Sequence, residues 1–215
     1  MTHLIISEKL SKTFASSIAS LPQFYLGSIA PDAVHNRANY VSDFKKASHL
    51  CVGGEKWGQI TNHEEWEKSI TGFYVKHRGT ANHDFVMGYC SHLLADSYNN
   101  KNVWIPFREK HPEETEKGYG SLSHLESNMV DIELALTYEG REDFWAKLAR
   151  SSSVDFPGII YAGEIDKQKD NILNIWFKDK QRQDLSANKM ITLESMAEFI
   201  ENATACITKT LQNIL

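Results

Sequence analysis

Apolar residues recur every three or four positions through most of this chain, a spacing that places them along one side of an α-helix. No stretch sustains the alternation of apolar and polar residues that is typical of a half-buried strand. We therefore expect an all-α fold, a single-domain helical bundle over residues 1–215. The predicted helices cover residues 7–20, 61 or 62 to about 76, roughly 82–99, 121 or 123 to about 138, 141–150, about 192–214 and, less regularly, 167–180.

Prolines, glycines and polar runs predict where these helices begin and end. Ser7 is a candidate N-cap for the first helix and Pro22 ends it, so His3 falls on the segment before the helix. Residues 24–35 are apolar but interrupted by a glycine and a proline, which predicts a buried loop or a short turn. Residues 99–120 are polar and predict a long loop, of the kind that often borders a site.

The stretch from Gly88 to Tyr98 holds the clearest candidate chemistry. His92 and Asp96 are four residues apart, so on a helix both side chains leave the same face. Such a pair can hold a divalent metal ion, or the two side chains can make a structural hydrogen bond. Asp84 and Gly88 extend the stripe by further steps of four residues. A glycine inside a helix costs about 1 kcal/mol relative to alanine, so Gly88 indicates that a ligand or another helix comes close.

Composition and charge narrow the function classes. The formal charge is −5, so we expect no basic surface for stable nucleic-acid binding. Three widely separated cysteines fit neither a zinc ribbon nor a disulfide framework. The N-terminal residues lack the pattern of a secretory signal, and no apolar run is long enough for a transmembrane segment. We expect a soluble, cytoplasmic protein, with its oligomeric state left open.

Histidine, the commonest metal-ligating side chain, is concentrated in the first part of the chain. Seven of the nine histidines fall within the first hundred residues, and five of these, at positions 3, 35, 49, 83 and 92, lie among several aspartates. The candidate ligands are His3, Asp32, His49, His92 and Asp96, with His35 and His83 as further candidates. Nitrogen and oxygen ligands without sulfur suit zinc in a catalytic site, and iron and manganese are the alternatives. With two or more ions, Asp96 could bridge them through its two oxygens.

Some of these candidates also have ordinary structural explanations. His3 could belong to a disordered terminus. Asp32, directly after Pro31, could cap the start of a short helix, although a carboxylate in so apolar a setting otherwise needs a cation or a metal ion. His49 follows a polar stretch that predicts irregular structure.

Four short motifs of the sequence resemble the zinc-dependent phospholipase C family: THLII, GSIAPD, SHL and GYCSHLLADS. The order His, Pro-Asp, His and His-x-x-x-Asp is harder to meet by chance than any one of these motifs. The resemblance runs from about residue 3 to residue 136 and implies an all-helical fold with a metal cluster in a cleft between helices. It maps the five candidate ligands onto zinc ligands, with Asp96 as the bridge.

The sequence departs from the family's pattern at one further zinc position. A further zinc position in the family uses a histidine shortly after the His-x-x-x-Asp helix and a later His-x-x-x-Glu motif. No histidine follows Asp96 closely, and the later motif here is His124 to Asn128, with asparagine where glutamate is expected. His124 and Asn128 are therefore candidates for an altered further position. The metal-site half covers about residues 1–136, and a helical scaffold covers about residues 137–215.

Metal-assisted hydrolysis of a small phosphoester is the function that this resemblance implies. A metal ion lowers the pKa of bound water and stabilises charge on phosphoryl oxygens. Asp32 or Asp84 is the expected general base, or the group that orients the attacking water. Arg37 either contacts the substrate phosphate or is a solvated surface residue. Lipid, nucleotide and metabolite esters all remain open as substrates.

Two alternatives account for part of the same pattern. His49, His83 and Asp84, with Asp131 or Asp155 as a later carboxylate, resemble the His…His-Asp pattern of HD-domain phosphohydrolases. The other alternative is a metal-stabilised binding module without turnover, because the further zinc position is altered.

Overall fold

The all-α prediction is confirmed for the residues that the structure, a computed structural model, describes: 1–55, 59–118 and 121–215. Within these ranges there is no strand, and the β-type pairing is an isolated bridge between Phe156 and Ile160. The elements are α1 (Thr2–Thr13), α2 (Leu21–Gly27), η1 (Pro31–Asn36), α3 (Ser42–Ser48), α4 (His63–His77), α5 (His83–Asn99), η2 (Asn100–Trp104), α6 (Ile105–Lys110), α7 (Pro112–Glu116), α8 (Leu122–Thr137), α9 (Arg141–Ala149), α10 (Ala162–Asp170), η4 (Asn171–Ile175) and α11 (Leu193–Gln212).

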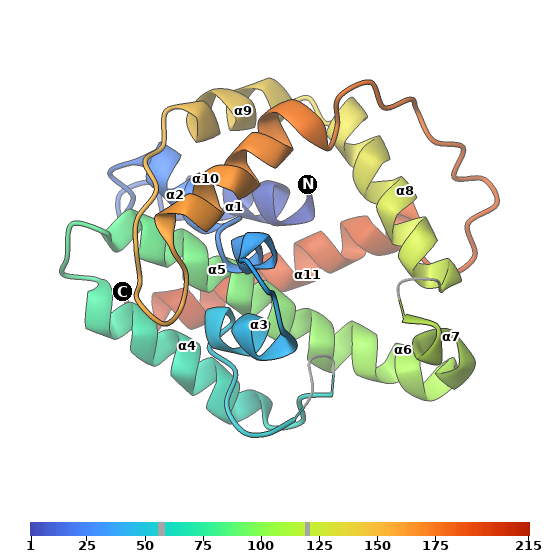
Figure 1. Cartoon of the computed structure of the whole chain (residues 1–215), viewed down its shortest axis with the longest axis horizontal. Helices are drawn as coiled ribbons and strands as arrows, with labels where there is room; N and C mark the ends of the chain where they lie inside the picture. Colours follow the sequence, from blue (N-terminus) through green and yellow to red (C-terminus); the bar gives the residue numbers. More distant parts are fainter. Residues whose placement is uncertain (56–58, 119–120) are drawn as a thin grey trace.

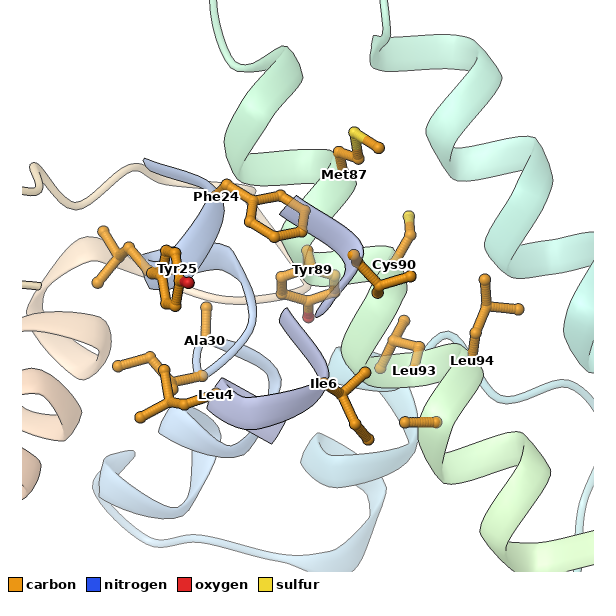
Figure 2. Packing of buried hydrophobic residues seen from close by; sticks show 14 of the residues in the cluster. Leu4, Ile6, Phe24, Tyr25, Ala30, Met87, Tyr89, Cys90, Leu93 and Leu94 are labelled. Carbon is orange, nitrogen blue, oxygen red and sulfur yellow. The ribbon is translucent and has the colours of Figure 1, made fainter. Parts of the chain in front are cut away.

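Helix α5 is the central element, and α2, α4 and α11 pack around it (Figure 1). It is apolar on nearly every side, and most of its residues are buried, which is the pattern of a helix enclosed by its neighbours. Side chains of α1, α2 and α5, among them Leu4, Phe24 and Tyr89, belong to one core cluster (Figure 2). Because α5 is packed on several sides, the positions of His92 and Asp96 on it are fixed relative to the neighbouring helices.

Two glycines let the backbones of α2 and α5 touch. A Cβ atom added to Gly88 would lie 1.9 Å from the carbonyl oxygen of Phe24, and one added to Gly27 would lie 2.0 Å from that of Phe85. No side chain fits in such a space. Of the two explanations for Gly88, close packing against another helix is therefore the one that the structure supports.

The predicted start of the first helix is wrong. Helix α1 begins at Thr2 and ends at Thr13, so His3 lies in its first turn and is neither disordered nor on a preceding segment. Ser7 does not cap the helix, because its hydroxyl donates to the carbonyl oxygen of His3 one turn earlier. The apolar residues Leu4 to Ile6 are buried, and their packing stabilises helical turns that begin before Ser7.

Three segments predicted as loops or irregular structure are partly helical. Residues 24–35 contribute most of α2 and η1, residues 45–50 include the end of α3, and residues 99–120 contain η2, α6 and α7. Prolines stand in the first turns of α2, η1, α6 and α7. Proline is compatible with the first turn of a helix, where its missing N–H is not needed, so these prolines start helices instead of breaking them.

The later helices pack onto the earlier ones. Helix α11 packs against α1 and α5, α9 packs against α2, and α10 packs against η1. The predicted caps at Asn62 and Ser121 are confirmed, since each side chain accepts a backbone N–H of the helix that follows. The described residues form one body, and none of their helices is long and apolar enough to cross a membrane.

Candidate metal centre

Five of the predicted ligands converge from four parts of the chain. His3 comes from α1, Asp32 from η1, His49 from the residue directly after α3, and His92 and Asp96 from α5. Their ligand atoms form two overlapping groups in which all atoms lie within 4.8 Å of one another. One group is His3, His92 and Asp96, and the other is Asp32, His49 and His92. These buried and half-buried triads could hold a metal ion.

The spacing within this cluster matches a set of ligands around a shared ion. The Nε2 atom of His49 lies 3.3 Å from Oδ2 of Asp96 and 3.4 Å from Oδ1 of Asp32. The Nε2 atom of His92 lies 3.5 Å from Oδ2 of Asp96 and 3.7 Å from Oδ2 of Asp32. Ligands about 2.0–2.1 Å from a tetrahedral ion are about 3.3–3.4 Å apart. The distances are therefore in the range expected for side chains that share a metal ion.

His92 is the residue common to the two triads, and Asp96, a member of the first, also contacts His49 of the second. Its Oδ2 atom faces His49 and His92, whereas its Oδ1 atom lies 3.5 Å from Nε2 of His3. The two oxygens thus point towards different imidazoles. Each oxygen of Asp96 is therefore placed beside a different part of the cluster.

Backbone carbonyls orient two of the imidazoles. Nδ1 of His92 lies 2.8 Å from the carbonyl oxygen of Ser28, and Nδ1 of His49 lies 3.0 Å from that of Lys45. A carbonyl oxygen only accepts, so each Nδ1 donates its proton and each Nε2 faces the cluster. Metal-ligating histidines commonly use such a hydrogen bond to fix the ring orientation and tautomer.

Some polar atoms of the cluster are buried but not hydrogen bonded. Nε2 of His92 and Nδ1 of His3 are both buried and have no hydrogen-bond partner among the described residues. The two rings stack, with centroids 3.7 Å apart and planes 10° apart. An unsatisfied buried polar atom costs about 1–3 kcal/mol, so the interior of the cluster is costly in the absence of a ligand.

The electrostatics of the cluster favour the protonation states that a metal ion needs at His3, Asp96 and Asp32. At His92, by contrast, burial is outweighed by the carboxylates of Asp96 and Asp32, which raise its pKa. Burial and the neighbouring His92 lower the pKa of His3 to about 3, so this imidazole is neutral at pH 7. Burial opposes ionisation of Asp96, but the neighbouring imidazoles of His92 and His49 hold its pKa below the usual range. Burial likewise opposes ionisation of Asp32, yet the neighbouring His49 and the charge of Lys45 keep its pKa low.

Asp84 lies away from the cluster. It precedes Asp96 by twelve residues on α5, about 18 Å along the helix axis. Its carboxylate accepts the backbone N–H groups of Ala19 and Ser20, at 3.2 and 2.7 Å, just before α2 begins. The expectation that Asp84 is a general base at the site is therefore not supported, and Asp32 is left as the candidate for that role.

The residues of the HD-domain alternative do not converge. Nε2 of His83 lies 3.0 Å from the hydroxyl of Tyr74, and its Nδ1 lies 3.2 Å from Asp84. His49 belongs to the other cluster. The later carboxylates are also engaged elsewhere, Asp131 with the amino group of Met1 and Asp155 with the backbone N–H of Ala162.

The remaining candidates lie at the edge of the site or outside it. His35 has its Nε2 3.8 Å from Oδ1 of Asp32, and its ring packs on Tyr40. His124 and Asn128 belong to neither triad, and Asn128 is exposed. Arg37 is neither solvated nor directed at the cluster, because it forms an ion pair with Glu164.

Lys45 is a functional candidate that the sequence reasoning missed. Its Nζ atom lies 3.2 Å from Oδ1 of Asp32, and its side chain is 16% exposed. Burial lowers the pKa of Lys45, but the charges of Asp32 and Asp96 outweigh this effect and raise it. The missed signal is helical spacing, since Lys45 and His49 are four residues apart and α3 was expected to be irregular.

Three cavities meet at the cluster. The smallest, about 270 Å³, reaches His3, Asp32 and His92. A large cleft of about 950 Å³ reaches His3 and Asp96 and is lined further by Trp104, Phe107, Lys110, Lys189 and Phe199. The third, about 450 Å³, reaches Asp96 from the side of Lys45. His49 and His92 are buried, whereas the side chains of His3 and Asp32 are 27% and 35% exposed, so the cluster opens towards these cavities.

Comparisons with known proteins assign no family: no protein-family description, curated protein or solved structure matches this chain.

Proposed function

We propose that this chain binds zinc in the His/Asp cluster and hydrolyses a phosphoester. The observation that carries the proposal is the convergence of His3, Asp32, His49, His92 and Asp96 at distances typical of metal ligands. The backbone hydrogen bonds of His49 and His92 add support, because they direct both Nε2 atoms into the cluster. The motifs shared with the zinc-dependent phospholipase C family agree with this reaction class.

In this proposal, zinc supplies a water of lowered pKa and stabilises charge on the phosphoryl group. Asp32 is ionised and partly exposed towards the smallest cavity, so its carboxylate can orient water or accept its proton. Asp96 and the imidazoles hold the ion. The low pKa of His3 keeps this residue neutral, so that it does not repel a cation at pH 7.

The surroundings of the cluster suit an ester with an apolar or aromatic part. Trp104, Phe107 and Phe199 line the large cleft that reaches Asp96. Lys110 and Lys189 line the same cleft together with the carboxylates of Asp96 and Glu198, and the two ammonium groups are available to a phosphoryl oxygen. These contacts support a small organic phosphoester as the substrate class.

The test is to measure the zinc content of the purified protein and its activity on a panel of phosphomonoesters and phosphodiesters. His92→Ala is expected to lose both zinc and hydrolysis, since His92 belongs to both triads. His83→Ala is the matched control on the same helix, and it is expected to keep both. Unchanged zinc stoichiometry in His92→Ala would contradict the metal site.

The binding-module alternative predicts a different outcome of the same experiment. It is favoured by the position of His124 and Asn128 outside both triads, which leaves the further zinc position of the phospholipase C family unassembled. Zinc bound in wild type without turnover of any ester on the panel would support a binding module over a hydrolase.

A further inference from the structure

The cavity beside Lys45 is a second approach to the cluster. We call it the Lys45 cavity; it has a volume of about 450 Å³, and its lining includes Lys45, Asp96, Asn100, Trp104 and His124. It meets Asp96 on the side of α3, whereas the smallest cavity meets His92 and Asp32 on the side of α1. A group that enters the Lys45 cavity thus contacts both a predicted metal ligand and a cation.

Lys45 is held at this position by its surroundings. It lies on α3, one turn before His49, and its Nζ atom is 3.2 Å from Oδ1 of Asp32. Its carbonyl oxygen accepts the Nδ1 proton of His49, so the backbone of the same residue also orients a predicted ligand. Lysine is seldom buried to this extent without a role for its charge, because an ammonium group loses its hydration on burial.

The charge balance of the site gives Lys45 such a role. Asp32 and Asp96 together carry two negative charges, which one divalent ion only neutralises. A phosphoester anion binds poorly to a neutral site. The ammonium group of Lys45 makes the loaded site positive by one charge, on the side where the cavity admits a ligand.

Asn100, a lining residue of the same cavity, has a buried polar atom without a hydrogen bond among the described residues. Asn100 is 6% exposed, and its Nδ2 donates to the carbonyl oxygen of Ile60 at 2.8 Å. This hydrogen bond fixes the amide, and its Oδ1 atom is left buried without a partner among the described residues. A hydroxyl or amine of a bound molecule would satisfy this acceptor.

We propose that Lys45 is a phosphate-binding residue, which holds a phosphoryl oxygen of the substrate at the end of the Lys45 cavity next to Asp96. The alcohol part of the ester extends along the cavity towards Asn100, which accepts a hydrogen bond from a polar group of that part. The inference rests on the proposed zinc site and adds the orientation of the ester within it.

The experiment measures binding of inorganic phosphate to the zinc-loaded protein by titration calorimetry. Lys45→Met is expected to keep its zinc, since it removes a cation that competes for Asp32, and to weaken phosphate binding at least about tenfold, as the loss of one charge-assisted hydrogen bond would. Lys45→Arg is expected to recover most of the affinity. Lys46→Met is the matched control, because Lys46 forms an ion pair with Asp43 on the same helix.

Each other outcome has a definite meaning. Unchanged phosphate affinity in zinc-loaded Lys45→Met would overturn the inference, and so would loss of zinc from that variant, since Lys45 would then only hold the cluster together. Zinc and phosphate binding that depends on Lys45, without turnover of any ester, would contradict the proposed hydrolysis and leave Lys45 as a phosphate-binding residue. A wild type that takes up no zinc would contradict both proposals.

Discussion

Helix α5 carries two His/Asp pairs of similar composition and very different surroundings. At its start, the carboxylate of Asp84 accepts two backbone N–H groups and contacts His83, whose other nitrogen lies 3.0 Å from the hydroxyl of Tyr74. Further along, Nε2 of His92 is buried without a hydrogen-bond partner and faces Asp96 at 3.5 Å. One pair is satisfied by the protein itself, and the other is not.

This difference separates a structural pair from a candidate site more clearly than residue type does. Buried polar groups in native proteins are nearly always hydrogen bonded, so an exception needs an explanation. The first pair tethers the start of α2 to the start of α5. In the second pair the imidazole of His92 is oriented by the carbonyl oxygen of Ser28 and the carboxylate of Asp96 is held ionised, but no described residue donates or accepts a hydrogen bond at Nε2 of His92.

The largest loss of stability is expected from Gly88→Ala. Gly88 lies on α5 between the two His/Asp pairs, so a shift of the helix there affects both. The new methyl group would overlap the carbonyl oxygen of Phe24, and the overlap can be relieved only by moving α2 away from α5. We expect a loss of about 3 kcal/mol in the free energy of unfolding, measured by urea denaturation. Gly72→Ala is the control, because Gly72 lies in α4 with nothing near its Cβ position. Gly72→Ala is expected to be neutral or stabilising by up to about 1 kcal/mol. Equal stability of the two variants would show that the backbones are not in contact.

A smaller effect, confined to one pair, is expected from Asp84→Ala. Loss of the carboxylate leaves the N–H groups of Ala19 and Ser20 without their acceptor. We expect the free energy of unfolding to fall by about 2 kcal/mol, as for the loss of a helix-capping side chain. Zinc content should stay at the wild-type value. A variant that folds normally but loses zinc would show that the two pairs are coupled.

The smallest loss of stability is expected from a change at Glu126 on α8. Like Asp84, Glu126 is a buried carboxylate whose oxygens accept backbone N–H groups. It accepts the backbone N–H groups of Lys189, Met190 and Ile191, at 2.7–2.9 Å. Burial opposes its ionisation, but these donors hold the pKa of Glu126 below its usual value.

A lowered pKa in the folded state stabilises the fold above the unfolded value, about 4.3 for glutamate, and the contribution is lost as the pH falls through the folded pKa. Glu126→Gln is therefore expected to be about 1 kcal/mol less stable than wild type at pH 7. Urea denaturation in acid should show that this difference shrinks. A constant difference at all pH values would mean that the charge of Glu126 is not what binds the 189–191 segment.

The bounds of helices with a regular apolar stripe were predictable. The bounds were less predictable where the burial of the first turn or a proline determines where a helix begins. The patterns of α4, α5, α8, α9 and α11 were found close to their observed bounds. The start of α1 was missed because Ser7 can cap a helix or bond within one, and only the burial of Leu4 to Ile6 decides between the two. The prolines of α2 and η1 were interpreted as breaks, although proline also starts helices.

Two parts of the candidate site were predictable: residues that lie close together in the sequence, and residues that belong to motifs resembling those of a known family. The His92/Asp96 spacing is a property of one helix and needs no tertiary information. Asp84 and Asp96 belong to one stripe of residues along α5, but this shared stripe does not predict that they are close together. Twelve residues of helix separate them, which is farther than the ligands of one metal site can lie apart. Lys45 was missed because its significance depends on the approach of α3 to η1.

The hydrogen bonds from His49 and His92 to main-chain oxygens have a consequence for protein engineering. Since the acceptors belong to the backbone of Lys45 and Ser28, an exchange of either side chain leaves the acceptor in its position. The two ring orientations can be altered only by shifting a stretch of chain as a whole. A substitution of Lys45 is therefore expected to remove its ammonium group and leave the acceptor of His49 in place, whereas Ser28 is fully buried beside Gly88 and tolerates little change.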